Sequence, residues 1–385
     1  MGEISRSEAV RQRERAQDAL LAACAAPLDD AARARIADLA RTFAAWEGLP
    51  RQAAVHGMGP LLYRALKEVE VTPPAEIRRA LQGLYLRSRC ANEVRFAVLQ
   101  NVLAAFEEAE ISAVVLKGAA LAHLVYADPA LRPMGDVDLW VDGARHLEAQ
   151  RLLRRLGFDA PLPADGVASC DHHLPQAMCR VDDVTVKIEI HHALMAQALH
   201  LAPRDLPLLG CEIAGRRAQA LAPTEMLWHL CQHLVNHALV FRPVRLLWMA
   251  DLARYLERFG SEVDWERVAQ RYPIVRDVLA LVHAVVPLPA AVLRQAAIVS
   301  YPPPAGAGES FRGWPSASLD QQRRAGKGWG RILGDTFLPP EWWLRLHHGR
   351  GPGRALLWQR WFAHPWEIGG WVGHLVRGRI EKRFA

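Results

Sequence analysis

The sequence predicts an α+β protein in which a small mixed β-sheet is embedded in a mainly helical chain. Three observations support this prediction. Apolar residues recur at three- and four-residue spacing through much of residues 7–95, which is typical of amphipathic helices. Short apolar runs next to glycine or paired aspartates follow in residues 111–191. Helical spacing returns after Pro223.

These changes of pattern divide the chain of 385 residues into four expected regions. The expected regions are an N-terminal helical region (1–92), a sheet-containing core (93–221), a C-terminal helical domain (222–300) and a linker followed by a basic, Trp-rich segment (301–385).

The elements of the core are expected to follow one another as strand, helix, strand, helix, strand and strand. A strong amphipathic helix over 92–110 should lead into them, preceded by a separate helix that starts after Pro73 and Pro74. The expected ranges are a strand at 111–116, a helix at 119–126, a strand at 136–141, a helix at 143–157 and a hairpin of strands 177–181 and 184–191.

The composition excludes several classes of protein. Hydrophobic residues make up 51% of the chain and charged residues 23%, which rules out a chain that is mainly disordered. No run approaches 18 apolar residues, so we expect no transmembrane segment. The polar N-terminal stretch predicts no secretory signal. Six cysteines without any CxxC motif are typical of reduced thiols, so we expect a cytoplasmic protein.

The C-terminal segment differs from the rest of the chain in charge. Residues 301–385 contain 13 Lys and Arg against 6 Asp and Glu, and 8 of the 13 tryptophans. Such a segment suits a membrane interface, a single-stranded nucleic acid or a protein partner. The favoured interpretation is packing against the helical body through large apolar residues, namely Trp342, Trp343, Leu344, Leu346, Leu357, Trp358 and Trp361. Residues 302–330, rich in Gly, Pro and Ser, are expected to be a linker.

Two aspartates on one strand are the sharpest chemical feature. In the run Asp136-Val137-Asp138-Leu139-Trp140-Val141, alternation puts Asp136 and Asp138 on the same face of the strand. Two neighbouring carboxylates repel each other unless a cation lies between them. Hard oxygen ligands of this kind suit Mg²⁺ or Mn²⁺.

A second strand is expected to add a third carboxylate. Lys187, Glu189 and His191 alternate with isoleucines and therefore share one face. If this strand lies next to the Asp136–Val141 strand, Glu189 reaches the two aspartates. Three carboxylates on adjacent strands can hold divalent metals for phosphoryl or nucleotidyl transfer.

A lysine and a glycine stand at an expected strand-to-helix turn. Gly118 allows backbone N–H groups to approach a phosphate, and the N-terminus of the following helix favours an anion. Lys117 and Arg132 are candidate contacts of a triphosphate because both carry a positive charge close to this turn and to Asp136.

Together these motifs resemble the nucleotidyltransferase superfamily with a polymerase-β-like catalytic core. More narrowly, the chain resembles the bacterial uncharacterised nucleotidyltransferase family. The resemblance is carried by LKGAALAHLVYADPALRPMGDVDLWV, HHLPQAMCR, KIEIHHAL, LWHLCQHLVNHA and RLLWMADLARYL, and covers about residues 45–260. The chain departs from the usual superfamily loop at Ala119, where Gly or Ser is common, and in its longer spacing from Gly118 to Asp136.

The resemblance implies a metal-dependent transfer of a nucleoside monophosphate from an NTP to an acceptor hydroxyl. Asp136, Asp138 and Glu189 would be the catalytic and metal-binding residues, with Mg²⁺ or Mn²⁺ as the cofactor. The nucleotide would be held by Lys117, Gly118 and Arg132. The acceptor stays open, with a small molecule, peptide or protein favoured over nucleic acid, and with peptide natural-product tailoring as one setting.

Several further polar residues are candidates for an acceptor pocket. The helix that contains His229 and His233 repeats histidine every four residues, so the rings lie along one stripe. The alternative is that they pack in a core or interface. Zinc is disfavoured because Leu230 stands where a metalloprotease helix needs Glu. The full candidate set is Lys187, His191, His173, His229, His233 and Arg245. For Arg245 and Asp251 the alternative is an ordinary salt bridge on a helix face.

Two alternative functions stay open. The same metal cage could act on another activated donor, such as a nucleotide sugar. The fold could also serve as a non-catalytic module that binds a peptide or protein, although such a module has no need for three clustered carboxylates.

Overall fold

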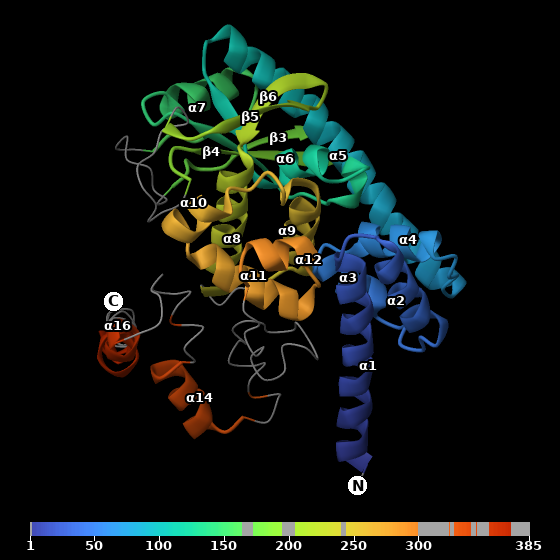
Figure 1. The fold of residues 1–385 in the computed structure, drawn as a ribbon. Coiled ribbons are helices and arrows are strands. Elements are labelled where there is room, and N and C mark those ends of the chain that lie inside the picture. The colour runs from blue at the N-terminus through green and yellow to red at the C-terminus, as the bar shows by residue number, and fades with distance from the viewer. Residues whose placement is uncertain are drawn as a thin grey trace, which may run out of the picture.

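A six-stranded mixed sheet lies in the upper part of the protein as drawn in Figure 1, with α5 along one side of it. The computed structural model describes residues 2–163, 172–194, 205–239, 244–298, 323, 327–339, 344 and 354–370. The sheet order is β3-β4-β2-β1-β6-β5, with β2 parallel to β4, β1 parallel to β6 and the other neighbours antiparallel. The strands are β1 (Ala113–Val115), β2 (Val137–Val141), β3 (Ala177–Val181), β4 (Val184–His191), β5 (Leu208–Ile213) and β6 (Arg216–Leu221).

The expected α+β class is confirmed, and so are the four strands that the sequence predicts. The β3–β4 hairpin has the expected ranges, and β1 and β2 differ from expectation only at their ends. The hairpin β5–β6 is not predicted. Its two-residue turn consists of Ala214 and Gly215, with φ of 54° and 71°, the left-handed backbone of a tight hairpin turn.

The helices that precede the sheet in the sequence form one N-terminal group. They are α1 (Gly2–Ala25), α2 (Asp30–Arg41), α3 (Leu49–Val55), α4 (Gly59–Glu68) and α5 (Ala75–Glu108). The two helices expected between Pro74 and Glu110 are in fact one, since α5 runs without a break through residue 92. In consequence a single rigid element joins the N-terminal helices to the sheet (Figure 1).

Helices pack against the sheet around β2 and β4. The helices α5 and α7 (His146–Arg155) both contact β4 and each other, and they cover the face on which Ile188 and Ile190 are fully buried. The helix α6 (Lys117–Leu124) contacts β2 and β5.

The last strand leads directly into a C-terminal helical group, which lies beside the sheet in Figure 1. In α9, Arg254 donates hydrogen bonds to the carbonyl oxygens of Cys24 and Ala25 at the end of α1, so this group also packs on the N-terminal helices. The group consists of α8 (Pro223–Leu239), α9 (Leu246–Phe259), α10 (Trp265–Arg271), α11 (Ile274–Val285) and α12 (Ala290–Gln295).

The C-terminal segment is described only in part, as α14 (Trp329–Phe337), α16 (Arg354–Trp358) and the π-helical turn η3 (Gln359–Ala363). Leu344 is buried, as the packing interpretation expects, but Leu357, Trp358 and Trp361 are each more than half exposed. For these three residues the expectation of packing against the body is wrong. Trp342, Trp343, Leu346 and most of the expected linker 302–330 lie outside the described residues.

Candidate active site

The pairing of β2 with β4 brings the expected carboxylates together. Asp138 stands opposite Glu189 in the parallel register. Along β2, Val137 and Leu139 alternate with Asp138 and are fully buried, so they point into the core on the other face. The sheet thus holds two carboxylates side by side on one face, and the core packing beneath them fixes their register.

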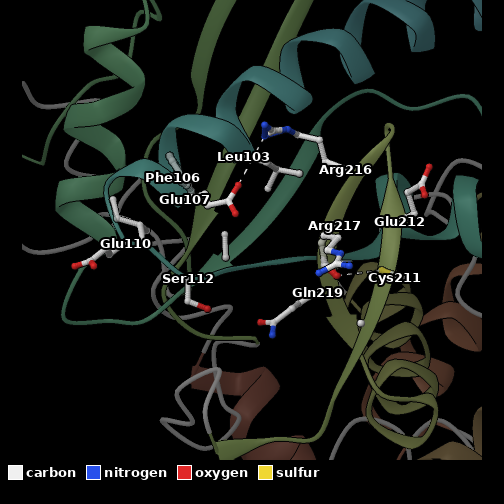
Figure 2. Close-up of a pocket in the computed structure, with 14 residues that line it drawn as sticks. Leu103, Phe106, Glu107, Glu110, Ser112, Cys211, Glu212, Arg216, Arg217 and Gln219 are labelled. Atoms are coloured by element: carbon white, nitrogen blue, oxygen red, sulfur yellow. Dashed lines mark hydrogen bonds and ion pairs between the residues drawn. The ribbon is translucent and has the colours of Figure 1, made fainter.

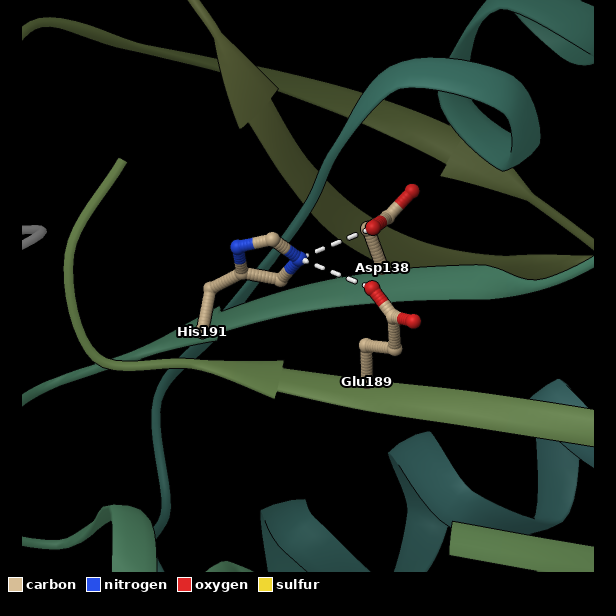
Figure 3. Close-up of side chains that lie close together, drawn as sticks. All are labelled: Asp138, Glu189 and His191. Atoms are coloured by element: carbon tan, nitrogen blue, oxygen red, sulfur yellow. Dashed lines mark hydrogen bonds and ion pairs between the residues drawn. The ribbon is translucent and has the colours of Figure 1, made fainter. Parts of the chain in front are cut away.

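A histidine completes this group. In Asp138, Glu189 and His191, one ligand atom from each residue lies within 4.8 Å of the others. His191 Nε2 is 2.8 Å from Asp138 Oδ1 and 3.7 Å from Glu189 Oε2, so the ring points between the two carboxylates (Figure 3). Glu189 Oε1 also accepts a hydrogen bond from Gln176 Nε2 at 3.0 Å. We refer to Asp138, Glu189 and His191 as the acidic cluster.

Lys117 supplies a positive charge to the acidic cluster. Its Nζ lies 3.0 Å from Asp138 Oδ1, and its φ of 42° is strained for a residue other than glycine. Burial raises the pKa of Asp138, but the Lys117 ammonium and the hydrogen bond from His191 outweigh it and hold that pKa well below its usual range. Asp138 is therefore ionised at neutral pH and able to hold a cation.

Asp136 stands one residue before β2, next to the acidic cluster. Burial and the negative charges of Asp138 and Glu189 raise its pKa, with Lys117 and Arg132 acting in the opposite direction. The two aspartates therefore have opposite pKa shifts, because the nearest cation contacts Asp138.

Arg132, an expected phosphate contact, forms a buried ion pair in the structure. Its Nε and Nη2 donate to the two carboxylate oxygens of Asp251 at 3.0 and 2.7 Å, and both side chains are more than 90% buried. Tyr126 Oη donates to the same carboxylate at 2.6 Å. Asn92 Nδ2 fixes the backbone nearby by donating to the carbonyl oxygens of Pro129 and Arg132. The salt-bridge alternative for Asp251 is correct, but the bridge is buried in the core and does not lie on a helix face.

Gly118 is required by this buried pair. A Cβ atom at Gly118 would collide with Arg132 Nη1. The glycine therefore permits the close packing of Arg132 whether or not its backbone also contacts a phosphate.

Three histidines surround the acidic cluster from other elements. The rings of His172 and His173 each have their centroids 5.4 Å from that of His191. His229, on α8, is fully buried, and neither of its ring nitrogens has a hydrogen-bond partner among the residues that the structure describes. Burial, followed by the charges of Lys117 and His191, holds the pKa of His229 well below its usual range, so the ring is neutral.

The remaining candidates lie farther along their elements. Lys187 is half-buried on β4, two residues before Glu189 and on the same face of the strand. His233 packs edge-on against Trp248, with ring centroids 5.1 Å apart. Arg245 is exposed at the N-terminus of α9. His172 and Gln176 near the acidic cluster are not predicted as site residues, although both lie in the stretch HHLPQAMCR that carries the family resemblance.

A separate hollow of about 780 Å³ lies elsewhere, between the C-terminal part of α5, the start of β1 and the β5–β6 hairpin (Figure 2). Glu107 and Arg216 face each other there at 3.8 Å, and Arg217 and Gln219 line the opposite side. None of the predicted site residues lines this hollow. The acidic cluster is therefore the better candidate for catalysis.

The sheet, its paired carboxylates and the Lys-Gly turn define a class of protein that acts on nucleoside phosphates, and comparison with known proteins agrees. The family model described as "Uncharacterised nucleotidyltransferase" matches residues 43–276, more than half of the chain. The chain belongs to this uncharacterised nucleotidyltransferase family, as the motifs predict.

Two further comparisons add little information about this chain. No curated protein matches the chain. One solved structure that does match is described as the antibiotic-resistance factor ANT(2'')-Ia, with 17% sequence identity over 47% of this chain and 92% of that chain, at a TM-score of 0.32. At that level the two chains share too little for residues to be compared one by one.

Proposed function

We propose that the protein is a metal-dependent nucleotidyltransferase that transfers a nucleoside monophosphate from an NTP to an acceptor hydroxyl. The observation that carries the proposal is the acidic cluster, in which Asp138 and Glu189 face each other in register on adjacent parallel strands, with Lys117 on the same carboxylate. Membership of the nucleotidyltransferase family supports the reaction type.

The donor set fits a divalent cation. Asp138 and Glu189 offer ionised carboxylates, which suit Mg²⁺ or Mn²⁺, and Asp136 stands beside them as a further carboxylate. These three residues would hold the metal, with His191 positioning the Asp138 carboxylate through its hydrogen bond. When bound, the metal would neutralise charge on the triphosphate and on the departing pyrophosphate.

The side chains of the site have distinct parts in the proposed reaction. The acceptor oxygen forms a bond to the α-phosphorus, the bond from that phosphorus to the bridging oxygen breaks, and pyrophosphate leaves. Glu189 is placed to take the proton of the acceptor hydroxyl, because its side chain lies in the acidic cluster and about one fifth of it is still exposed to an incoming acceptor. Lys117 binds the triphosphate at the start of α6, where the helix N-terminus also favours an anion.

The acceptor would enter beside the histidines. His173 borders the acidic cluster next to His191, and the neutral ring of His229 lies close to the cluster, with neither of its ring nitrogens hydrogen-bonded to another described residue. The neutral ring of His229 can donate or accept a hydrogen bond without adding charge, which suits a polar, uncharged acceptor group better than an anionic one. A small molecule, a peptide or a protein carrying a hydroxyl fits this chemistry.

The test is nucleotide binding by the full chain. Melting temperatures are measured with each of the four NTPs and with nucleotide sugars, in the presence and absence of Mg²⁺ or Mn²⁺. We expect an NTP to raise the melting temperature only when metal is present. In Asp138→Asn this rise should disappear, and transfer of α-labelled phosphate to any acceptor found should fall by roughly 10³-fold or more, because the cation loses several kcal/mol of binding and transition-state contact.

A matched control is Asp183→Asn, which removes a fully exposed carboxylate from the β3–β4 turn of the same sheet. This variant should behave as the wild type. If no NTP raises the melting temperature in a metal-dependent way, the proposal is wrong. A response to nucleotide sugars alone would replace it with the alternative donor.

A further inference from the structure

The helix at the C-terminal end of the described chain exposes its aromatic side chains. The helix consists of α16, η3 and residues 364–370 in continuous order. Trp358, Trp361, Phe362 and Trp366 are 60%, 56%, 65% and 84% exposed. Large aromatic residues in a globular protein are usually covered, so a set of four in one short helix marks a surface that binds something. We call these four residues the aromatic face.

The opposite side of the same helix is buried although it is partly polar. Leu356, Gln359 and His364 are each less than 10% exposed, and His364 Nε2 lies 3.0 Å from the carbonyl oxygen of Thr336 in α14. The helix is thus amphipathic in the reverse sense, with polar groups inside and tryptophans outside. Packing on the rest of the protein does not account for this orientation, because the best apolar surface of the helix is turned away from it.

The stretch of sequence that contains this helix is basic. Residues 301–385 carry 13 Lys and Arg against 6 Asp and Glu. Within the helix, the guanidinium of Arg360 lies 6.0 Å from the ring centroid of Trp361, so a cation accompanies the aromatic face directly. Further along the sequence, residues 377–383 add four more basic residues.

We propose that the aromatic face binds the surface of a bilayer that contains anionic lipids. Tryptophan and phenylalanine place their rings at the boundary between headgroups and acyl chains, and neighbouring arginines interact with anionic headgroups. A single-stranded nucleic acid would instead require a basic groove along which the backbone could run, with aromatic rings inside it. In the described helix only Arg354 and Arg360 are basic, whereas four large aromatic residues are exposed.

The site of attachment is separate from the acidic cluster, since the helix contributes none of the side chains that surround it. Within the described residues, no helix has the length and apolar character needed to cross a membrane. The surface proposed here lies in the plane of the bilayer and does not span it. An enzyme attached in this way would meet acceptors that are themselves held at a membrane.

The experiment measures binding of the full-length protein to vesicles by co-sedimentation. One set of vesicles is phosphatidylcholine alone and the other contains phosphatidylglycerol as well. We expect binding about tenfold tighter to the anionic vesicles, weakened by added salt, because each basic residue near the surface adds attraction that salt screens. Brominated lipids should quench part of the tryptophan fluorescence of the bound protein.

The variant carries Trp358→Ser, Trp361→Ser and Phe362→Ser, and should bind the anionic vesicles at least about tenfold more weakly because three apolar side chains no longer enter the interface. Its melting temperature should equal that of the wild type, since all three side chains are exposed. The matched control is Val55→Ser, Leu86→Ser and Leu156→Ser, which removes three exposed apolar side chains from other helical parts of the protein.

Binding by the wild type and the control, with loss in the aromatic-face variant, supports the proposal. Equal binding by all three proteins would overturn it, as would an absence of vesicle binding by the wild type. Two further outcomes would contradict the proposal, and in both the variant keeps its affinity for vesicles. In the first, the variant loses self-association in light scattering. In the second, it loses binding to labelled single-stranded DNA. None of these outcomes depends on nucleotidyl transfer.

Discussion

Two ion pairs lie at the Lys117-Gly118 turn, and they differ in how much of their side chains is exposed to solvent. Arg132 and Asp251 form a salt bridge with two hydrogen bonds, and 7% and 3% of their side chains are exposed. Lys117 and Asp138 form a single contact with 15% and 6% exposed, and Asp138 is shared with His191. The first pair has both charges satisfied within the protein, while the second keeps carboxylate and ammonium positions free for a ligand.

The difference agrees with the proposed function, in which this turn is held rigidly by one ion pair and binds the nucleotide through the other. The closed pair joins the loop before β2 to α9, because Arg132 and Asp251 come from those two elements. The more open pair is then held at a fixed position relative to Glu189. Three predictions test this division into a structural pair and a binding pair.

The largest effect is expected from breaking the closed pair. Asp251→Ala leaves the Arg132 guanidinium buried without a counter-charge and removes the acceptor of Tyr126 Oη, so the free energy of unfolding should fall by about 3–5 kcal/mol. Chemical denaturation measures this loss. Asp183→Ala breaks an exposed ion pair with Arg180 and should cost less than about 1 kcal/mol. Equal costs for the two variants would show that Arg132 is available for another role, including a phosphate.

A smaller effect is expected at the binding pair. Lys117→Met removes the ammonium from a partly buried site, and we expect the dissociation constant for the NTP to rise about 30-fold, equivalent to about 2 kcal/mol. A titration of the NTP followed by thermal shift, with metal present, measures the constant. Lys67→Met, at the exposed end of α4, is the control and should leave it unchanged. An unaltered constant in Lys117→Met would limit Lys117 to holding Asp138 in place.

The smallest effect is expected for Asp136. Burial and the charges of Asp138 and Glu189 raise the pKa of Asp136 on folding. The ionised carboxylate therefore destabilises the folded state at neutral pH. The folded state gains stability as the pH falls through the raised pKa. Asp136→Asn should therefore raise the melting temperature by about 2 °C or less at pH 7 in metal-free buffer. Below the ordinary pKa of 3.8 the two proteins should converge, because both side chains are then neutral. A lower melting temperature at pH 7 would instead identify Asp136 as a structural residue.

The sequence predicts β2 and β4 well because their patterns are local. Alternation places Asp138 on one face of β2 and Glu189 on one face of β4, opposite the buried isoleucines, and the pairing of the two strands brings the carboxylates together. The same reasoning predicts His191 only as a candidate for the acceptor pocket. Its contact with Asp138 depends on the parallel register between β2 and β4, which no single strand contains.

Two features of the structure lie beyond what the local pattern shows. The sequence marks Arg132 as a phosphate contact because it lies close to Asp136 in the chain, but it does not show the buried pairing with Asp251, which is more than a hundred residues away. The sequence also misses β5 and β6, because their alternation is weak, with Gly210 and Cys211 at positions where β-branched residues are common. The prediction of packing fails for Trp358 and Trp361 for a different reason, since it assumes that the protein itself covers them.

The place of β6 in the sheet has a consequence for synthesis of the protein on the ribosome. Val114 in β1, the first strand of the sheet, pairs with Gln219 in β6, the last strand to join the centre. Until residue 221 has emerged, β1 has an unpaired edge toward the position of β6, and such an edge can pair with strands of other chains. Loop closure over this distance is slow compared with formation of the β3–β4 hairpin. We therefore expect nascent chains that stop before β6 to depend on chaperones, and the face that carries the acidic cluster to mature only after residue 221 has emerged.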